Sequence, residues 1–444
     1  MSCSPPVFPV VGIGTSAGGL EALESFLQRV PRHSGMAFVV VQHLDPTHKG
    51  MLVELLQRVS VLPVEQATDG QRLEPDHVYV IPPNRDLSLL RGELHLFQPT
   101  SAGGVHLPID FFFRSLADDQ QERSIGVILS GMGSDGTLGL RSIKEKAGAA
   151  FVQAPSSAKY DGMPRSAIEA GLADIVAPVE ELPAKILAYR QHAPHIERPT
   201  GEPEDKTLSA LQRVFVLLRS HTGNDFSLYK KTTILRRVER RMGLHQIDTV
   251  GHYVRFLREN PREIELLFKE LLIGVTAFFR DPECWVPLVH EALPALLSGN
   301  VSDGALRAWV PGCSTGEEAY SLAMIFKEAA EPFRSLRNVT LQIFGTDLDR
   351  EAIGKARQGL YPHTIAADVS PERLRRFFVH EERGFRVAKE IWSGTAARMA
   401  HASMQAHSGW PTRAYQRASS SALAGSNACT TRIATACGKS GERR

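Results

Sequence analysis

The chain carries no strong charge of either sign. Its 444 residues include 51 Lys and Arg against 49 Asp and Glu, which gives a formal net charge of +2. Proteins that bind duplex nucleic acid concentrate basic residues in a large patch, and a near-neutral balance gives no support to such a patch. We therefore expect no nucleic acid among the partners of this chain.

Long hydrophobic runs and metal-type cysteine spacings are also missing. No apolar stretch approaches the ~18 residues that a membrane helix needs. The N-terminal residues lack the basic and apolar segments of a signal peptide. The five cysteines show neither a CxxC pair nor zinc-ligand spacing. We expect a cytoplasmic location, reduced thiols, no bound metal and no insertion into a membrane.

The composition that remains is that of a globular protein of two or three domains. Hydrophobic residues make up 43% and charged residues 23% of the chain. Up to about residue 190, short apolar runs alternate with helical periods. We expect buried strands at 36–42 (MAFVVVQ), 77–81, 124–129 (SIGVIL) and 149–153, and a hairpin at 89–97. This alternation predicts an α/β domain with a doubly wound parallel sheet.

The stretch Val10–Leu20 (VVGIGTSAGGL) joins the first expected strand to a helix. Its residues 14–18 fit the G-x-S-x-G pattern, in which a tight turn exposes a serine, here Ser16, at the carboxyl edge of a sheet. The same glycines half-resemble a dinucleotide loop, although the third glycine falls at 18 rather than 17. A plain strand-to-helix turn is the third interpretation.

Three of the expected strands end in residues that can do chemistry together. Ser16 follows the first strand, His43 follows MAFVVVQ, and Asp135 lies in the glycine loop after SIGVIL. The carboxyl ends of parallel strands meet at one edge of a sheet. We predict a triad in which Ser16 is the nucleophile, His43 the base and Asp135 the orienting carboxylate. A dinucleotide-binding loop would instead be accompanied by an acidic residue at the end of the second strand, where this sequence has Gln42 and His43.

Four segments closely resemble, in order, the catalytic domain of the chemotaxis-receptor methylesterase family (CheB). They are GIGTSAGGLEAL, VVVQHLDP, LSGMGSDGTLGL and AKYDGMPRSAIEAG, and the match covers about residues 7–190. The resemblance implies Ser16 as nucleophile, His43 as general base and acid, and Asp135 as the carboxylate that fixes His43. It implies hydrolysis of glutamyl methyl esters on chemoreceptors, and often deamidation of glutamine, with no cofactor.

The same resemblance implies further features of the site and its pathway. The main-chain N–H groups of Ala17 and Met132 would stabilise the oxyanion. Methylated chemoreceptor-type proteins would be the partners, within a chemosensory phosphorelay that also includes histidine-kinase partners. Members of the family usually carry an N-terminal receiver domain. This chain begins at the strand before Ser16, so we expect regulation by other means.

The second half opens with a linker and a helical region. Residues 191–204 are rich in proline and charge and read as a linker. Tyr229–Gly243 (YKKTTILRRVERRMG) reads as a basic helix. Its Lys and Arg residues fit either a solvated face or a surface that docks an acidic partner. In a third hypothesis for the whole chain, the part around Arg236–Arg241 binds receptor tails and the protein is a non-catalytic adaptor.

A second strand–loop–helix pattern follows. ALRAWV (305–310) leads into a glycine loop that contains Glu317 and Glu318, and VTLQIF (339–344) runs into a loop that contains Asp347. In nucleoside-binding α/β folds, an acid at the end of the second strand holds the ribose hydroxyls. The two glutamates would repel the phosphates of a dinucleotide. The pattern therefore favours S-adenosylmethionine over NAD.

Four further segments resemble the chemotaxis-receptor glutamate O-methyltransferase family (CheR) over residues 205 to about 391. They are VTAFFRDP, WVPGCSTGEEAYSLAM, FGTDLDREAIGKARQGLYP and VSPERLRRFFV. The resemblance implies that S-adenosylmethionine contacts Thr276, Arg280, Glu318 and Asp347. One position departs from the pattern, because Gly274 stands where the family often has asparagine.

The character of the sequence changes again at Trp392. The residues from there to Arg444 are rich in Ala, Ser, Thr, Gly and Arg, and Glu442 is their only acid. Such a composition cannot bury a core. We expect a disordered or aberrant tail, an incomplete α/β domain and a loss of transferase activity. A bifunctional methylesterase and methyltransferase is the alternative.

These observations divide the chain into five expected segments. They are a methylesterase domain (1–190), a linker (191–204), a helical domain (205–283), a partial S-adenosylmethionine-binding domain (284–391) and a tail (392–444).

Overall fold

The computed structural model describes most of the chain. The described residues are 8–42, 51–99, 106–192, 204–272, 274, 276–298, 305–331, 340–382, 384–389, 391 and 398–401. The predicted base His43 and nearly all of the predicted tail lie outside them. The chain divides into two compact units, which are formed by Met1–Leu211 with Leu235–Glu259, and by Gln212–Ile234 with Asn260–Arg444.

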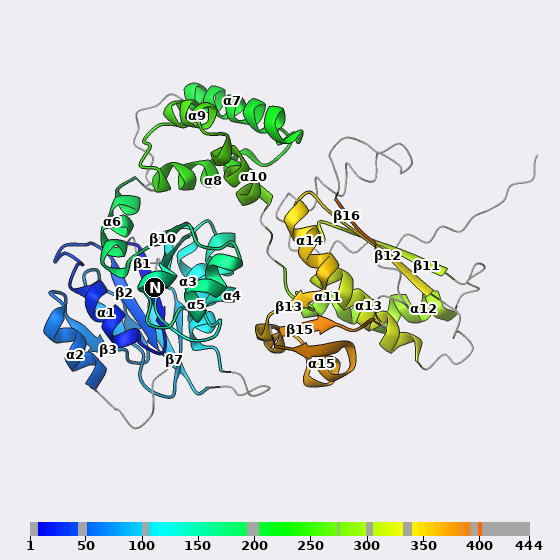
Figure 1. The fold of residues 1–444 in the computed structure, drawn as a ribbon, viewed down its shortest axis with the longest axis horizontal. Helices are drawn as coiled ribbons and strands as arrows, with labels where there is room; N and C mark the ends of the chain where they lie inside the picture. The colour runs from blue at the N-terminus through cyan, green and yellow to red at the C-terminus, as the bar shows by residue number, and fades with distance from the viewer. Residues whose placement is uncertain are drawn as a thin grey trace, which may run out of the picture. The chain divides into compact units, whose positions relative to one another are not determined.

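A parallel sheet with β1 at its centre forms the frame of the first unit. Among the described residues it has seven strands in the order β10-β9-β8-β1-β2-β5-β3. The strands are β1 (Val10–Thr15), β2 (Ala37–Gln42), β3 (Val64–Gln66), β5 (Val78–Val80), β8 (Ser124–Ile128), β9 (Ala149–Gln153) and β10 (Ile175–Ala177). After β1 the chain forms β2, β3 and β5 on one side of β1, and it then crosses over to form β8, β9 and β10 on the other side. The topological switch point therefore lies at β1, between β2 and β8 (Figure 1).

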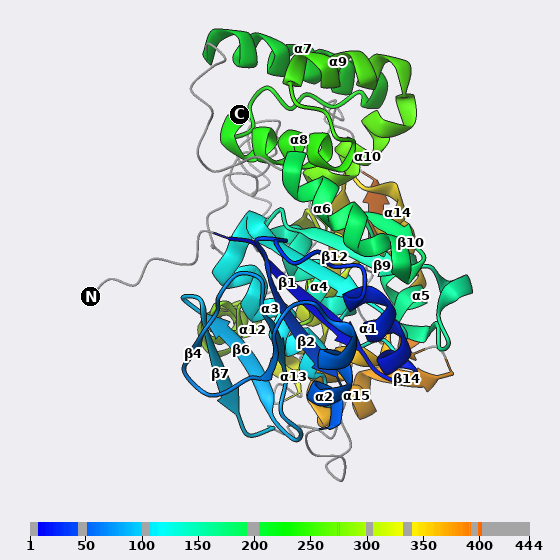
Figure 2. The ribbon, with the colours of Figure 1, turned by 90° about the vertical axis from the view of Figure 1, so that its left-hand side faces the viewer.

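Helices cover both faces of this sheet (Figures 1 and 2). They are α1 (Gly19–Leu27), α2 (Met51–Val59), α3 (Pro108–Gln120), α4 (Thr137–Glu145), α5 (Gly162–Glu169) and α6 (Leu182–His192). Helices α1 and α6 pack on the face that carries Val11 and Ile13. Helices α3 and α4 pack on the opposite face, which carries Val10 and Val39. The predicted doubly wound α/β fold is confirmed.

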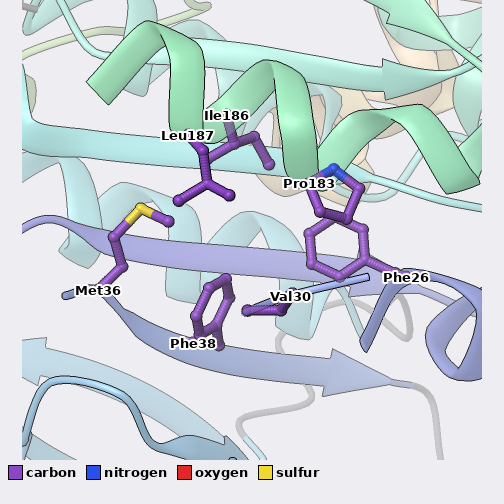
Figure 3. A pocket seen from close by; sticks show the side chains of 7 residues that line it. All are labelled: Phe26, Val30, Met36, Phe38, Pro183, Ile186 and Leu187. Atoms are coloured by element: carbon purple, nitrogen blue, oxygen red, sulfur yellow. The ribbon is translucent and has the colours of Figure 1, made fainter. Parts of the chain in front are cut away.

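A small gap remains under α1 and α6 (Figure 3). Seven apolar side chains line it: Phe26, Val30, Met36, Phe38, Pro183, Ile186 and Leu187. Because the lining has no polar side chain, the gap has no group that could orient a substrate. Met36 comes just before β2, so the gap lies at the amino ends of the strands, away from Ser16.

A small antiparallel sheet adjoins α3 in the first unit. Its order is β4-β7-β6, with β4 (Gln71–Arg72), β6 (Asp86–Leu90) and β7 (Glu93–Phe97). Arg91 and Gly92 join β6 to β7, and both have positive φ, as a tight two-residue hairpin turn requires. Gly92 N–H donates to Asp119 Oδ2 on α3 at 3.1 Å. The predicted hairpin is confirmed, although β6 begins earlier than expected, at Asp86.

Four helices follow, and the basic one among them differs from expectation. They are α7 (Glu204–Thr222), α8 (Lys231–Leu244), α9 (Val250–Glu259) and α10 (Pro261–Leu272). On α8, Arg237, Arg240 and Arg241 are only 4%, 1% and 7% exposed. The interpretation of this basic stretch as a solvated face is therefore wrong for these three residues.

The contacts of Arg237 and Arg240 explain their burial. Arg237 donates to the main-chain carbonyl groups of Lys144 and Glu145, at the C-terminal end of α4. Arg240 forms an ion pair with the buried carboxylate of Asp174, which Lys144 also contacts. Cationic groups are favourable at helix C-termini, where carbonyl groups lack intrahelical partners. The acidic group that this part of α8 binds thus belongs to the first unit itself.

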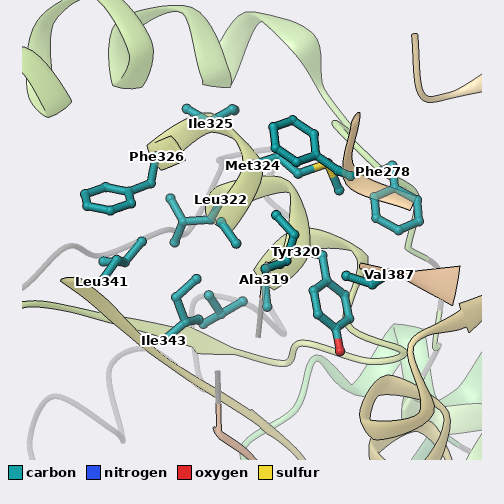
Figure 4. Close-up of a cluster of buried hydrophobic side chains, with 14 of the residues drawn as sticks. Phe278, Ala319, Tyr320, Leu322, Met324, Ile325, Phe326, Leu341, Ile343 and Val387 are labelled. Atoms are coloured by element: carbon teal, nitrogen blue, oxygen red, sulfur yellow. The ribbon is translucent and has the colours of Figure 1, made fainter. Parts of the chain in front are cut away.

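The second unit contains the remaining described elements. They are α11 (Pro282–Pro287), the π-helical turn Leu288–Ala292, α12 (Leu293–Ser298), β11 (Ala305–Pro311), α13 (Glu317–Ala330), β12 (Thr340–Asp347), α14 (Arg350–Gln358), β13 (Leu360–Tyr361), α15 (Pro371–Phe377), β14 (Phe378–Glu381), β15 (Gly384–Val387) and β16 (Arg398–His401). Helix α13 is buried on most sides. Its side chains Tyr320, Leu322 and Met324 lie in a hydrophobic core that also contains Phe278 (Figure 4). The two predicted strands and their following helices are confirmed as β11–α13 and β12–α14.

The strand β16 corrects one expectation. Residues 398–401 lie in the segment that the composition marks as disordered, yet they pair in parallel with β12, with Phe344 opposite Arg398. Met399 is 5% exposed and joins the core, and Arg357 of α14 donates to its carbonyl group. Pairing with an existing strand and burying one large side chain order these four residues despite their weak local pattern.

Candidate active site

Ser16 lies in a tight turn between β1 and α1. The turn places Gly18, the residue before α1, at φ 70°, a conformation that favours glycine. The main-chain N–H of Ser16 donates to Ser130 O at 3.0 Å, and the carbonyl of Ser16 accepts from Gly19 N–H at 3.0 Å. A Cβ atom on Gly131 would lie 3.1 Å from Ser16 Cβ and 2.2 Å from Met163 Sδ. A larger residue at position 131 would therefore displace Met163 and crowd Ser16, whereas glycine leaves both in place.

Ser130 ties together the loops that follow three neighbouring strands. Its hydroxyl donates to Ala17 O at 3.0 Å and accepts from Tyr160 N–H at 3.0 Å. Its carbonyl accepts from Thr15 Oγ1 at 2.8 Å, and its N–H donates to Gln153 Oε1 at 2.9 Å. Ser130 is 1% exposed. The sequence does not mark Ser130 as a site residue, because its only signal is its place as the first residue after the SIGVIL strand.

Asp135 lies in the same loop, buried just before α4. Its carboxylate accepts three main-chain N–H groups, from Ile109 at 3.1 Å, Asp110 at 2.9 Å and Gly136 at 2.8 Å. Ile109 and Asp110 belong to the first turn of α3, where N–H groups lack intrahelical acceptors. The carboxylate is thereby fixed at the end of β8, the strand that adjoins β1.

The predicted base His43 lies outside the described residues, and its role stays a prediction. The strand before it is described up to Gln42, which pairs with Thr15. That register brings the ends of β1 and β2 to the same level of the sheet. The oxyanion roles of Ala17 and Met132 likewise stay predictions. Met132, whose main-chain N–H is the predicted donor, is 63% exposed.

Asp347 ends β12 in the second unit, and its carboxylate holds the neighbouring loop. It accepts Ser314 N–H at 2.8 Å and Asp349 N–H at 2.7 Å. Burial raises the pKa of Asp347 above its usual range, and the N–H donors counteract this only in part. Gly312, Ser314 and Gly316 all have positive φ. Glycine adopts such angles at little cost, so the backbone strain of this loop lies at Ser314, with φ 46°.

This part of the second unit fits the predicted cofactor. Ser314 Oγ is buried and has no hydrogen-bond partner among the described residues, as expected for a group that a ligand would satisfy. A Cβ atom on Gly274 would lie 3.3 Å from that hydroxyl, so the departing position Gly274 lies beside the same loop. Asp347 supplies the acceptor that a ribose hydroxyl needs.

The other predicted cofactor contacts are Glu318, which follows this loop, and Thr276 and Arg280, which come before it in the sequence. Glu318 is half-buried in the first turn of α13, whereas Glu317 is 5% exposed and accepts the hydroxyl of Thr315 at 2.6 Å and 2.8 Å. The carbonyl of Arg280 accepts the indole N–H of Trp285 at 2.8 Å. Thr276 lies four residues before Arg280 in the sequence. The roles of Thr276, Arg280, Glu318 and Asp347 stay predictions.

The described residues hold no group of three or more His, Cys, Asp or Glu side chains that could bind a metal ion. Within the same part of the chain, no helix is both long enough and apolar enough to cross a membrane.

Three family models match the chain in succession. Residues 11–186 match the model of the CheB methylesterase. Residues 209–272 match that of the CheR methyltransferase all-alpha domain, and residues 274–401 match that of the CheR methyltransferase SAM binding domain. The region that contains Asp347 is therefore of a kind that binds S-adenosylmethionine.

Known proteins resemble one part of the chain or both. A protein-glutamate methylesterase/protein-glutamine glutaminase of Moorella thermoacetica is 38% identical over 41% of this chain and 44% of its own length. A Leptospira interrogans protein assigned to the same class is 34% identical, and the match covers 39% of this chain and 91% of that protein. A 104.1 kDa protein from the hypE 3' region of Rhodobacter capsulatus is 36% identical over 77% of this chain and 38% of its own length.

A solved structure also resembles the first part. The Thermotoga maritima CheB methylesterase catalytic domain is 32% identical, and the match covers 40% of this chain and 97% of that one with a TM-score of 0.38. The chain spans less than half the length of several curated relatives, with shares of 38%, 44% and 48%.

Proposed function

This chain belongs to the CheB methylesterase family, and we propose that it hydrolyses glutamyl methyl esters of chemoreceptor-type proteins through Ser16, His43 and Asp135. The observation that carries the proposal is the network of Ser130. It joins the loop of Ser16 to the loop of Asp135 at the switch point of the sheet, where α/β folds place their sites.

The proposed reaction has two steps. Ser16 Oγ attacks the ester carbonyl carbon while His43 accepts the hydroxyl proton, and Asp135 holds the imidazole in the correct tautomer. The bond to the methoxy group then breaks, and His43 returns the proton so that methanol leaves. A water molecule, activated by His43, hydrolyses the acyl-enzyme to the free carboxylate. The same cycle on a glutamine amide would release ammonia.

The oxyanion of each tetrahedral intermediate needs N–H donors. We assign them to the main chain of Ala17 and Met132, because one follows the nucleophile and the other lies in the loop that Ser130 fixes beside it. The methyl-ester substrate explains the partners that we propose, which are methylated chemoreceptors and the histidine kinases that signal with them. The site needs no cofactor in this proposal, and we place the protein in the cytoplasm.

The Ser16→Ala variant tests this function. Purified full-length protein is incubated with receptor carrying radiolabelled glutamyl methyl esters, and released methanol is counted. We expect release by the wild type and by the control Ser220→Ala, an exposed serine on α7. Release should fall to background for Ser16→Ala, since loss of a triad nucleophile removes about 10⁶-fold of rate. Unchanged release by Ser16→Ala would refute the proposal.

A bifunctional methylesterase and methyltransferase is the second candidate, favoured by the two CheR matches over residues 209–272 and 274–401. S-adenosylmethionine, when bound, supplies the methyl group. Thr276, Arg280, Glu318 and Asp347 would hold it, with Asp347 accepting from the ribose. The adaptor hypothesis loses its main support, because Arg237, Arg240 and Arg241 are buried.

A further inference from the structure

The first turns of α3 and α4 exchange carboxylate contacts. Neither residue before these helices, Leu107 or Gly136, caps its own helix with a side chain. Asp135, at the start of α4, accepts the N–H groups of Ile109 and Asp110 in α3. In return Asp110 Oδ1 accepts Gly139 N–H in α4 at 2.6 Å. Each helix therefore takes its capping acceptor from the other.

Close packing makes this exchange specific. A Cβ atom on Gly139 would lie 2.4 Å from Phe113 Cβ and 3.1 Å from Asp110 Cα, so only glycine allows the two helices to approach at this point. Asp110 is 2% exposed and Asp135 is 5% exposed. A movement of the α4 N-terminus relative to α3 would displace the Asp135 carboxylate and break the contact between Gly139 N–H and Asp110 Oδ1.

We propose that Asp110 is a positioning residue for Asp135, because its side chain ties the first turn of α4 to the first turn of α3 and so fixes the carboxylate between them. This inference rests on the proposed esterase function, in which Asp135 orients His43. Asp110 contacts no reacting atom in this scheme. Its effect on the reaction passes through the position and charge of Asp135.

The charge state of the pair supports the same role. Burial, and then repulsion by Asp135, raise the pKa of Asp110 to about 8, while Gly139 N–H and Arg114 act in the opposite direction. Asp110 Oδ2 has no hydrogen-bond partner among the described residues, and a neutral oxygen is far less costly to bury there than a charged one. The raised pKa favours the neutral form of Asp110 at neutral pH, so that the pair is buried without two adjacent negative charges. Above pH 8 a second charge would develop in the pair.

Two substitutions separate positioning from charge. Asp110→Ala removes the acceptor for Gly139 N–H, and Asp110→Asn keeps an acceptor oxygen that cannot ionise. The control is Asp119→Asn, which changes a capping aspartate on the same helix that binds Gly92 N–H instead. Each variant is assayed as full-length protein, by kcat and KM on methylated receptor from pH 6 to 9.5, and by Tm from pH 5 to 9.

We expect Asp110→Ala to lower kcat by about 10- to 100-fold with little change in KM, as misplacement of a catalytic group does. Asp110→Asn should recover most of that loss, and its profile should lack the decline that the wild type shows above pH 8. Wild-type kcat in Asp110→Ala, or equal losses in both variants, would overturn the positioning role. A wild-type decline that persists in Asp110→Asn would overturn it as well.

The Tm series does not depend on catalysis. A raised pKa in the folded state means that stability present below about pH 4 is lost as the pH rises towards 8. The Tm of Asp110→Asn relative to the wild type should therefore rise between pH 5 and pH 9, and that of Asp119→Asn should not. A flat difference for Asp110→Asn refutes the inference about the pair. Absence of esterase activity in both the wild type and Asp119→Asn would instead refute the proposed function.

Discussion

Ser130 connects the turn that carries Ser16 to the loops that follow β8 and β9. Its buried hydroxyl donates to Ala17 O and accepts from Tyr160 N–H, so Ser130→Ala leaves these two main-chain groups without this partner. We expect the free energy of unfolding to fall by about 1–3 kcal/mol, as for other buried groups left unpaired. We also expect a lower kcat for methyl-ester hydrolysis, because the turn that carries Ser16 would lose its anchor. Urea unfolding and kinetics of Ser130→Ala beside Ser220→Ala measure both. A variant as stable and as fast as Ser220→Ala would show that the hydroxyl is dispensable.

The sequence reveals some of these residues and hides others for a physical reason. Ser16 and Asp135 can be singled out in the sequence because each combines a reactive side chain with a place at a strand end, and their catalytic roles stay predictions. Ser130 and Asp110 cannot, because their importance lies in contacts with loops and helices distant in the chain. In the sequence, Asp110 is only an ordinary acid in a first helical turn. His43 was predicted in the same way as Ser16, and it stays a prediction.

At the scale of elements, helix α8 adds a buried ion pair to the first unit. Burial would raise the pKa of Asp174, but Arg240 and Lys144 outweigh it and hold that pKa well below its usual range. Arg240→Ala removes one of these cations, and we expect a loss of up to about 3–5 kcal/mol in the free energy of unfolding at pH 7. Asp174 contributes stability above pH 4 that is lost on acidification, so the difference from the wild type should shrink below about pH 4.

Urea unfolding of Arg240→Ala at pH 7 and at pH 3.5 measures both effects, and Arg236→Ala on the same helix is the control. Arg236 is exposed, and no shift of Asp174 is attributed to it. If Arg240→Ala unfolds like Arg236→Ala at pH 7, then α8 does not stabilise the first unit through this ion pair.

Element prediction succeeded where burial determines the pattern. The strands β1, β2, β8 and β9 are continuous apolar runs, as strands covered on both faces must be. The short strands β4 and β13 have two residues each, too few to show any period. Helix α8 shows another limit. Its period identifies a helix, but the polar side of a helix does not tell whether water or another element covers it.

The whole molecule combines regions that match two families in one chain. The Rhodobacter capsulatus relative matches over 77% of the chain, so the same two regions follow one another in a longer protein. The domain limits at 190, 204, 283 and 391 remain our proposal. The two families carry opposite reactions on one substrate class, since one removes the methyl group that the other adds. A chain with both activities would need separate control of each.

The transferase half can be judged by whether it binds its cofactor. Among the described residues, the predicted contacts come from 276–347, and Gly274 supplies no side chain where the family often has asparagine. Beyond β16 the composition offers no apolar segment for another strand of the sheet. We therefore expect no saturable heat when S-adenosylmethionine is titrated at micromolar concentrations into the full-length protein. Micromolar binding that disappears in Asp347→Ala, a change at the carboxylate that would hold the ribose, would overturn this prediction. It would favour the bifunctional enzyme, because only a formed site depends on that carboxylate.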